Sequence, residues 1–298
     1  MSDRSNPSDE VRKGVAYGLS AYVIWGCFPL FFSLFEGVPA WEVVVHRVIW
    51  SCLFLVGLIT VLGRWAPVRE ALARPGRLGR VLWCAILIAL NWGIFIYAIE
   101  TRQAFQASLG YFLTPLVNVA LGMVVLRERM AGLQKLAVAL AAMAILAQLV
   151  MLGELPWITL ALALTFGTYG LLRKQITLDG VSGLFVETLL LLPFAVVALA
   201  WLSMVGRSHL FEALPTSLLL MSSGVLTAVP LLLFAVAAQR LKLSTIGFLM
   251  YINPTMQFLI ALLIFREPLS VAQFSTFVLI WIGLAIYSWS AWSGRRGA

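Results

Sequence analysis

The sequence predicts an all-α fold, a polytopic membrane bundle of ten transmembrane helices in two inverted five-helix repeats. Of the 298 residues, 61% are hydrophobic and only 11% are charged, whereas globular domains are about 45–50% apolar and about 25% charged. The apolar residues gather in ten segments, and a pattern in the fourth segment returns in the ninth. These observations exclude an ordinary globular domain and indicate a membrane protein.

Each apolar segment approaches the length of about 20 residues that a helix needs to cross a hydrocarbon core of ~30 Å. The segments cover residues 15–35, 43–62, 81–99, 104–126, 135–152, 156–172, 181–205, 216–238, 244–265 and 270–291. The first segment is longer than the apolar core of a cleaved signal peptide, so we expect it to remain as a helix. The short connections predict one compact bundle.

The positions of Lys and Arg predict the orientation, because positively charged loops stay in the cytoplasm. With the N-terminus inside, the inside segments hold 17 of the 21 Lys and Arg. The outside segments hold only Arg102, Arg207 and Arg266, and Arg47 lies within a segment. Both termini are therefore predicted to be cytoplasmic. The net charge of +8 follows from this topology, so we expect no nucleic-acid partner.

An internal repeat is visible at an offset of 139 residues. The string YFLTP at 111–115 aligns with MYINP at 250–254, and Arg-Glu at 127–128 then aligns with Arg-Glu at 266–267. The fourth segment thus corresponds to the ninth, and an odd number of crossings separates them, so the two copies have opposite directions.

The repeat predicts four parts of the chain. These are a cytoplasmic tail (1–13), a first five-helix repeat (14–152), a second five-helix repeat (153–292) and a second cytoplasmic tail (293–298). Inverted repeats provide two packings of similar energy, the geometry of alternating access.

Polar side chains in the two corresponding segments are candidate substrate-binding residues. Thr114 aligns with Asn253 and Asn118 aligns with Gln257, and each pair of positions four apart shares one helix face. Two such faces are expected to line a central cavity. The alternative is that they only form hydrogen bonds between helices. The candidates include two further residues, Tyr111 and Tyr251.

Asn91 and Trp92 lie in the middle of the third segment. Asparagine is costly there, and this tryptophan is away from the membrane interface where tryptophan is usually found. We therefore expect both side chains to belong to the wall of a cavity that binds an amphiphilic ligand.

Three ionisable residues within segments are candidates for charge or proton coupling: His46, Arg47 and Glu187. His46 lies four residues after Glu42, on the same helix face. The alternative for the second segment is that Arg47 extends to the lipid headgroups and His46 only packs. Glu187 is interpreted as a protonatable carboxylate facing the cavity, or alternatively as a structural acid bonded to a neighbouring helix.

The sequence offers no catalytic residues, metal site or cofactor site. It lacks the P-loop pattern for ATP and the HExxH zinc motif. The string GVSG at 180–183 has a serine, but both histidines are predicted on the opposite side of the membrane. We therefore expect a protein that is not an enzyme.

Several strings together resemble the RarD-type permeases, members of the EamA family within the drug/metabolite transporter superfamily. They are HRVIWS at 46–51, NW at 91–92, ASLGYF at 107–112 with Pro115, GLF at 183–185 with Glu187 and Thr188, and YINP at 251–254. The resemblance extends over about residues 13–290. It implies ten helices in two inverted repeats and a place in the bacterial inner membrane.

The expected function is that of a secondary transporter, by resemblance an exporter. The substrate is expected to be a small amphiphilic metabolite or drug, such as a chloramphenicol-like compound, and the other expected partner is the lipid bilayer. Two alternatives stay open. A lipid-carrier flippase would have a lateral opening and a basic pocket near one leaflet, and a membrane scaffold would have fully paired polar residues and no cavity.

Overall fold

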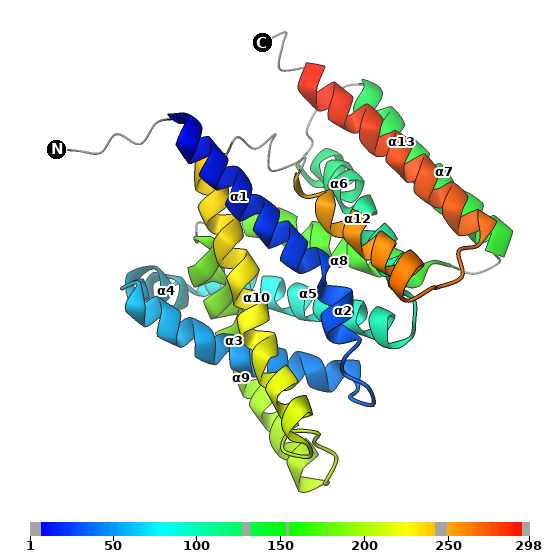
Figure 1. The fold of residues 1–298 in the computed structure, drawn as a ribbon. Helices are drawn as coiled ribbons and strands as arrows, with labels where there is room; N and C mark the ends of the chain where they lie inside the picture. Colours follow the sequence, from blue (N-terminus) through cyan, green and yellow to red (C-terminus); the bar gives the residue numbers. More distant parts are fainter. Residues whose placement is uncertain (1–6, 127–131, 153–154, 177, 242–248, 294–298) are drawn as a thin grey trace.

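The computed structural model describes residues 7–126, 132–152, 155–176, 178–241 and 249–293. Every regular element within these ranges is helical (Figure 1). The predicted all-α class is therefore confirmed for the described part of the chain.

The first half of the chain forms α1 (Pro7–Gly26), α2 (Phe28–Phe32), α3 (Ala40–Val61), α4 (Trp65–Ala73), α5 (Pro75–Glu100), α6 (Ala104–Leu126) and α7 (Gly132–Leu152). The second half forms α8 (Trp157–Lys174), α9 (Gly180–Met204), α10 (Leu214–Arg240), α12 (Ile252–Leu259), the π-helical turn η1 (Ile260–Ile264) and α13 (Val271–Ser293).

Six helical segments of the described chain are long and apolar enough to cross a membrane. They are Glu10–Phe32, Ala40–Val61, Gly76–Glu100, Gly180–Met204, Leu214–Phe234 and Val271–Trp289. All ten apolar segments of the sequence nevertheless overlap a helix or two consecutive helices.

The first helical segment differs from the sequence prediction. The helix already begins at Pro7 and is interrupted at Cys27, where α1 gives way to α2. Pro29 causes this break because proline has no N–H for the carbonyl one turn earlier. That carbonyl belongs to Trp25, and the side chain of Gln257 lies at hydrogen-bond distance from it, with Nε2 to O at 3.5 Å.

Helix α4 is a second difference, because the sequence analysis treated this part of the chain as a connection. Its buried residues are Val68 and Ala71, and Trp65 packs edge-on against Phe185 of α9 at 5.7 Å between ring centroids. The helix has only 9 residues and has arginines within and beside it. Its apolar side therefore does not form a segment long enough to be recognised as a membrane span.

Carboxylates cap the N-terminal ends of two helices, α9 and α6. Asp179 accepts hydrogen bonds from the backbone N–H groups of Val181 and Ser182 and thereby caps α9. Partial burial opposes its ionisation, but these bonds and the nearby Arg64 hold the pKa of Asp179 below its ordinary value.

Glu267 caps α6 from a distant part of the chain. Its two oxygens accept the backbone N–H groups of Ala104 and Phe105 at 2.7 and 3.0 Å. Burial raises the pKa of Glu267, while the two N–H donors act in the opposite direction. The Arg-Glu pair of the first repeat, at 127–128, lies outside the described residues.

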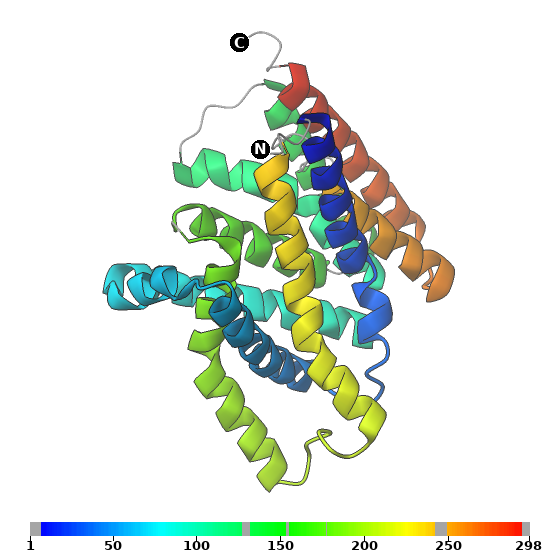
Figure 2. The ribbon, with the colours of Figure 1, turned by 60° about the vertical axis from the view of Figure 1, so that its left-hand side comes forward.

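The helices pack mainly between the two halves of the chain. Helix α10 lies beside α1 and α3, α8 lies beside α5 and α6, α12 contacts α1 and α6, and α3 contacts α9. Helices α7 and α13 run side by side at the edge of the molecule, and both views show this (Figures 1 and 2). The first turn of α1 and the last turn of α13 lie at the same end of the bundle (Figure 2).

A close approach between α3 and α10 depends on Gly224. A Cβ atom there would overlap the carbonyl carbon of Trp50 and lie 2.5 Å from the nitrogen of Ser51. Both neighbours are backbone atoms, so the helices themselves would have to separate.

We therefore predict that Gly224→Ala lowers the free energy of unfolding by about 1–3 kcal/mol, the usual cost of overpacking. Thermal unfolding in detergent would measure it. Gly57→Ala is the matched control, since a Cβ at Gly57 of α3 meets nothing within 4 Å. Equal melting temperatures for the two variants would contradict the prediction.

Candidate functional site

Several of the candidate residues from the sequence lie around the guanidinium of Arg47. This side chain of α3 is buried, with 4% of the residue exposed. Its Nε donates a hydrogen bond to Thr227 Oγ1 of α10 at 2.7 Å. Its Cζ lies 4.1 Å from the ring centroid of Trp92 in α5, and 5.4 Å from those of Phe28 and Phe32 in α2.

These contacts make Arg47 a buried cation stabilised by aromatic faces. Cation–π contacts of this kind contribute about 0.5–2 kcal/mol each. Within the described ranges no carboxylate forms an ion pair with Arg47. The interpretation that Arg47 extends to the lipid headgroups is therefore wrong. The site has the charge and the apolar walls to bind an anionic or hydrogen-bond-accepting group.

Asn91 holds three helices together next to this cation. Its Nδ2 donates to the carbonyl of Leu162 at 3.1 Å and to Thr165 Oγ1 at 2.9 Å, both in α8. Its Oδ1 accepts the hydroxyl of Tyr111 from α6 at 3.1 Å. Asn91 thus positions the tyrosine, whose ring packs against Phe95 and Phe166.

The paired residues of the repeat have different partners in the two halves. In the second half, Gln257 Nε2 donates to Asn253 Oδ1 at 2.7 Å, while Gln257 Oε1 is buried and has no hydrogen-bond partner among the described residues. In the first half, Thr114 Oγ1 donates to the carbonyl of Gly110 in its own helix, and Asn118 is exposed. The contacts of Thr114 favour a structural role.

Two neighbouring contacts concern the same crossing of α6 and α12. Ser108 Oγ of α6 donates to the carbonyl of Pro254 in α12 at 2.8 Å. Tyr251, directly before α12, is half-buried and packs against an apolar cluster that includes Phe112 of α6 and Phe258 of α12. The corresponding segments of the predicted repeat therefore meet directly.

Glu187 is buried beside α8 and away from the Arg47 cluster. Its Oε1 lies 3.5 Å from Arg173 Nε, and its Oε2 accepts the hydroxyl of Tyr169 at 3.3 Å. Arg173 also donates to the carbonyls of Leu178 and Asp179 in the turn before α9. This is the arrangement of an acid bonded to a neighbouring helix, the alternative of the sequence analysis.

His46 faces a second acidic residue. Its Nε2 lies 3.9 Å from Glu42 Oε1, and both side chains are fully buried. Glu42 also contacts His209, with 2.7 Å between Oε2 and Nδ1.

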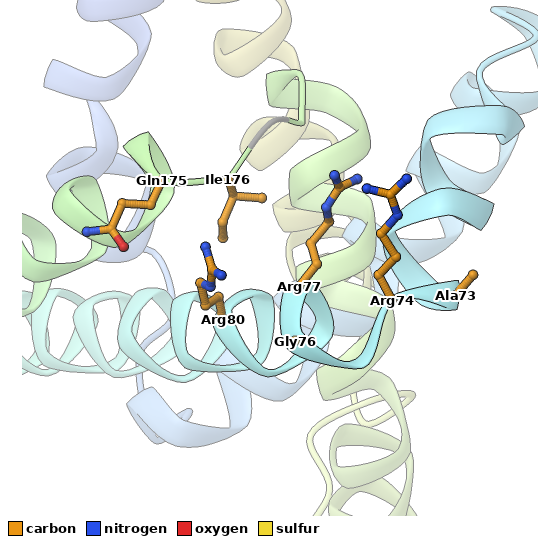
Figure 3. A pocket seen from close by; sticks show the side chains of 7 residues that line it. All are labelled: Ala73, Arg74, Gly76, Arg77, Arg80, Gln175 and Ile176. Carbon is orange, nitrogen blue, oxygen red and sulfur yellow. The ribbon is translucent and has the colours of Figure 1, made fainter.

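A separate hollow of about 440 Å³ lies at the start of α5. Its lining includes three arginines, Arg74, Arg77 and Arg80, together with Gln175 and Ile176 at the end of α8 (Figure 3). Figure 3 shows Arg74 and Arg77 extending in the same direction. Glu70 pairs with both of these arginines, at 3.2 and 3.3 Å.

Sequence reasoning missed Thr227, Thr165, Arg173 and His209. Thr227, Thr165 and Arg173 are partners of predicted site residues, and His209 is a partner of Glu42, the residue next to the predicted His46. Each lies on another helix or loop, and spacing along the chain carries no signal for such pairs. Their only sign in the sequence was a polar side chain in or near an apolar segment. Within the described ranges no group of His, Cys, Asp and Glu could hold a metal ion.

Similarity to known proteins extends over nearly the whole chain. Residues 12–150 match the EamA-like transporter family. Protein RarD of Salmonella typhi is 45% identical over 93% of this chain and 95% of its own length. The chain is a RarD-type member of the EamA-like transporter family.

Two further relatives of this RarD-type protein support its assignment to a transporter family. An uncharacterized transporter of Vibrio cholerae is 44% identical over 94% of this chain and 93% of its own length. The Chloramphenicol-sensitive protein RarD of Pseudomonas aeruginosa is 33% identical, with 94% of each chain covered. The protein is therefore a membrane transporter, and its family is consistent with a protein that is not an enzyme.

A solved crystal structure shares the fold of this RarD-type chain. The TM-score is 0.58 at 17% sequence identity, with 92% of this chain and 96% of that chain covered. At this identity the likeness concerns the fold alone.

We predict that Asn91→Ala destabilises this RarD-type permease by about 1–3 kcal/mol, because it leaves buried polar partners unpaired. Tyr111→Phe should cost less, and the double variant should cost less than the sum of the two single variants, since they remove one shared hydrogen bond. Thermal unfolding of the four proteins in detergent measures this cycle. Strict additivity would show that the Tyr111–Asn91 bond contributes nothing.

Proposed function

We propose that this protein is a secondary transporter of small amphiphilic molecules that have an anionic or hydrogen-bond-accepting end. The observation that carries the proposal is the Arg47 cluster. A guanidinium within a bilayer costs ~2.5 kcal/mol or more, so a cation kept there with no carboxylate partner among the described residues favours a functional role. The aromatic walls would contact the apolar part of the substrate.

Alternating access between two inverted repeats, residues 14–152 and 153–292, is the proposed mechanism. The packing supports it, because the contacts correspond when the halves are exchanged. The pair α1–α10 corresponds to α8–α5, α3–α10 to α9–α5, and α1–α12 to α8–α6. The pairs α3–α9, α6–α12 and α7–α13 each join corresponding helices.

The proposed binding residues come from both halves of the chain. Arg47, Trp92 and Tyr111 would contact the substrate, and Asn91 would position Tyr111. In the second half, Asn253 and Gln257 are the proposed counterparts. The buried Oε1 of Gln257, which has no hydrogen-bond partner in the described part of the chain, supports this, because a substrate donor could satisfy it.

The proposed place is the bacterial inner membrane, with both termini in the cytoplasm and transport toward the outside. The bacterial relatives support the location in a bacterial membrane, and the distribution of Lys and Arg supports the cytoplasmic placement of both termini. Chloramphenicol-like drugs are candidate substrates because the Pseudomonas aeruginosa relative is named a chloramphenicol-sensitive protein. Glu187 and Arg173 are proposed to close the cytoplasmic end, since Arg173 also holds the α8–α9 turn.

We expect Arg47→Met to reduce transport of an aromatic carboxylate at least about tenfold, the effect of losing ~1.4 kcal/mol of interaction with the charged group. Transport of the matching aromatic amide should change much less. Arg47→Lys should keep part of the carboxylate transport, because it keeps the charge without the planar stacking. Proteoliposomes loaded with each compound provide the measurement.

Arg69→Gln is the matched control, because Arg69 is exposed on α4. Carboxylate transport by Arg47→Met at the wild-type rate would contradict the assignment of Arg47 to binding.

A second candidate function is a flippase for anionic lipids, favoured by the hollow with three arginines. This hollow lies at the face predicted to be cytoplasmic, and a basic pocket near one leaflet is what a flippase requires. Anionic headgroups attract such clusters by about 1 kcal/mol per basic residue. The amphipathic helix α4 beside it is suited to the membrane surface.

For the flippase, the combined variant Arg74→Gln, Arg77→Gln and Arg80→Gln should slow movement of fluorescent phosphatidylglycerol between leaflets several-fold. Glu70→Gln is the control, because it removes the carboxylate that pairs with Arg74 and Arg77 and should not slow the movement. Chemical quenching of the outer-leaflet label measures the rate. Rates equal to those of protein-free vesicles in all samples would exclude this function.

A further inference from the structure

Both histidines of the chain contact one buried carboxylate. Glu42, in the first turn of α3, is fully buried. Its Oε1 accepts the backbone N–H of His209 at 2.8 Å, and its Oε2 lies 2.7 Å from Nδ1 of the same histidine. Nε2 of His46 lies 3.9 Å from Oε1 on the other side. The chain has only these two histidines.

The hydrogen bonds define the proton position on His46. The indole N–H of Trp50 donates to Nδ1 of His46 at 3.3 Å, so that nitrogen acts as the acceptor. The proton of a neutral His46 must then be on Nε2, the atom nearest to Glu42. This nitrogen is buried and has no hydrogen-bond partner within the described structure. The site therefore has an unused donor next to its carboxylate.

His209 connects Glu42 to the second half of the chain. It lies in the loop 205–213 between α9 and α10, which projects from the lower end of the bundle in Figure 2. The loop turns through positive φ at Gly206 and Phe211. The side chain of His209 is 29% exposed, so protons from the solvent can reach it.

Several other charged side chains lie near Glu42 and His209. On the loop, Glu212 lies 3.9 Å from Nε2 of His209, and Arg207 is exposed. At the start of α3, Glu100 of α5 accepts the backbone N–H of Ala40 at 3.1 Å. Among the described residues no Lys or Arg forms an ion pair with Glu42. Protonation of His209 would therefore neutralise a buried negative charge.

We propose that Glu42, His209 and His46 form a proton-binding latch that closes the end of the transporter predicted to face outside. The proton binds to the imidazole of His209, which then donates to Glu42 as a charged group. The bond to the Glu42 carboxylate gains the Coulomb attraction of a full positive charge when the imidazole is protonated, so proton binding and closure favour each other. The latch rests on the proposed transport function and adds the proton as its coupling ion.

The test is hydrogen–deuterium exchange of the loop 205–213 in the full-length protein in lipid nanodiscs, at about pH 5.5 to about pH 8, the range in which histidine usually titrates. After correction for intrinsic exchange, protection should rise as the pH falls. A single linked proton changes the closed-to-open ratio by at most about tenfold per pH unit, and we expect at least about fivefold over the range.

His209→Asn is the decisive variant, because the amide can still donate to Glu42 but cannot take up a proton. Its protection should be independent of pH. Glu42→Gln should lower protection at every pH. Glu70→Gln is the matched control and should behave as wild type, because Glu70 is exposed on α4, where it pairs with Arg74 and Arg77.

Protection that does not depend on pH in the wild type would overturn the latch. A pH dependence that persists in His209→Asn would overturn it as well. Because this readout needs no transport, a failure to transport any tested compound would count against the proposed function alone.

Discussion

The low dielectric constant around Arg47 is the constraint on which the centre of the molecule depends. A buried guanidinium must be compensated, and in the described part of the chain three aromatic rings and one hydroxyl do so in place of a carboxylate. These groups come from α2, α5 and α10, so the cation is stable only when helices from distant parts of the chain meet around it. The cation therefore links the packing of the bundle to the chemistry of the site.

Other polar contacts link distant segments in the same way. Ser108 bonds the backbone at Pro254, Glu267 holds the start of α6, and Glu42 holds the α9–α10 loop. Each such bond contributes only ~1 kcal/mol. Many small contributions of this kind are compatible with the proposed exchange between two packings.

Apolar segments in the sequence predicted the helices well, because a long apolar run has few stable alternatives in a membrane. The differences have local causes. Pro29 interrupts the first helix at Cys27, and α4 was missed because its two buried residues lie among arginines. The candidate site was predicted in part: Arg47, Asn91, Trp92 and Tyr111 are close together, whereas Glu187 has separate partners.

The sequence by itself determined the all-helical class, the membrane environment and the presence of polar groups at costly positions, since these follow from composition and local spacing. Only the tertiary structure decided the partners. Thr227 and Arg47 are separated by 180 residues, and His209 and Glu42 by 167, so their contacts depend on how the helices cross. No local pattern encodes such a crossing, because it results from packing over the whole bundle.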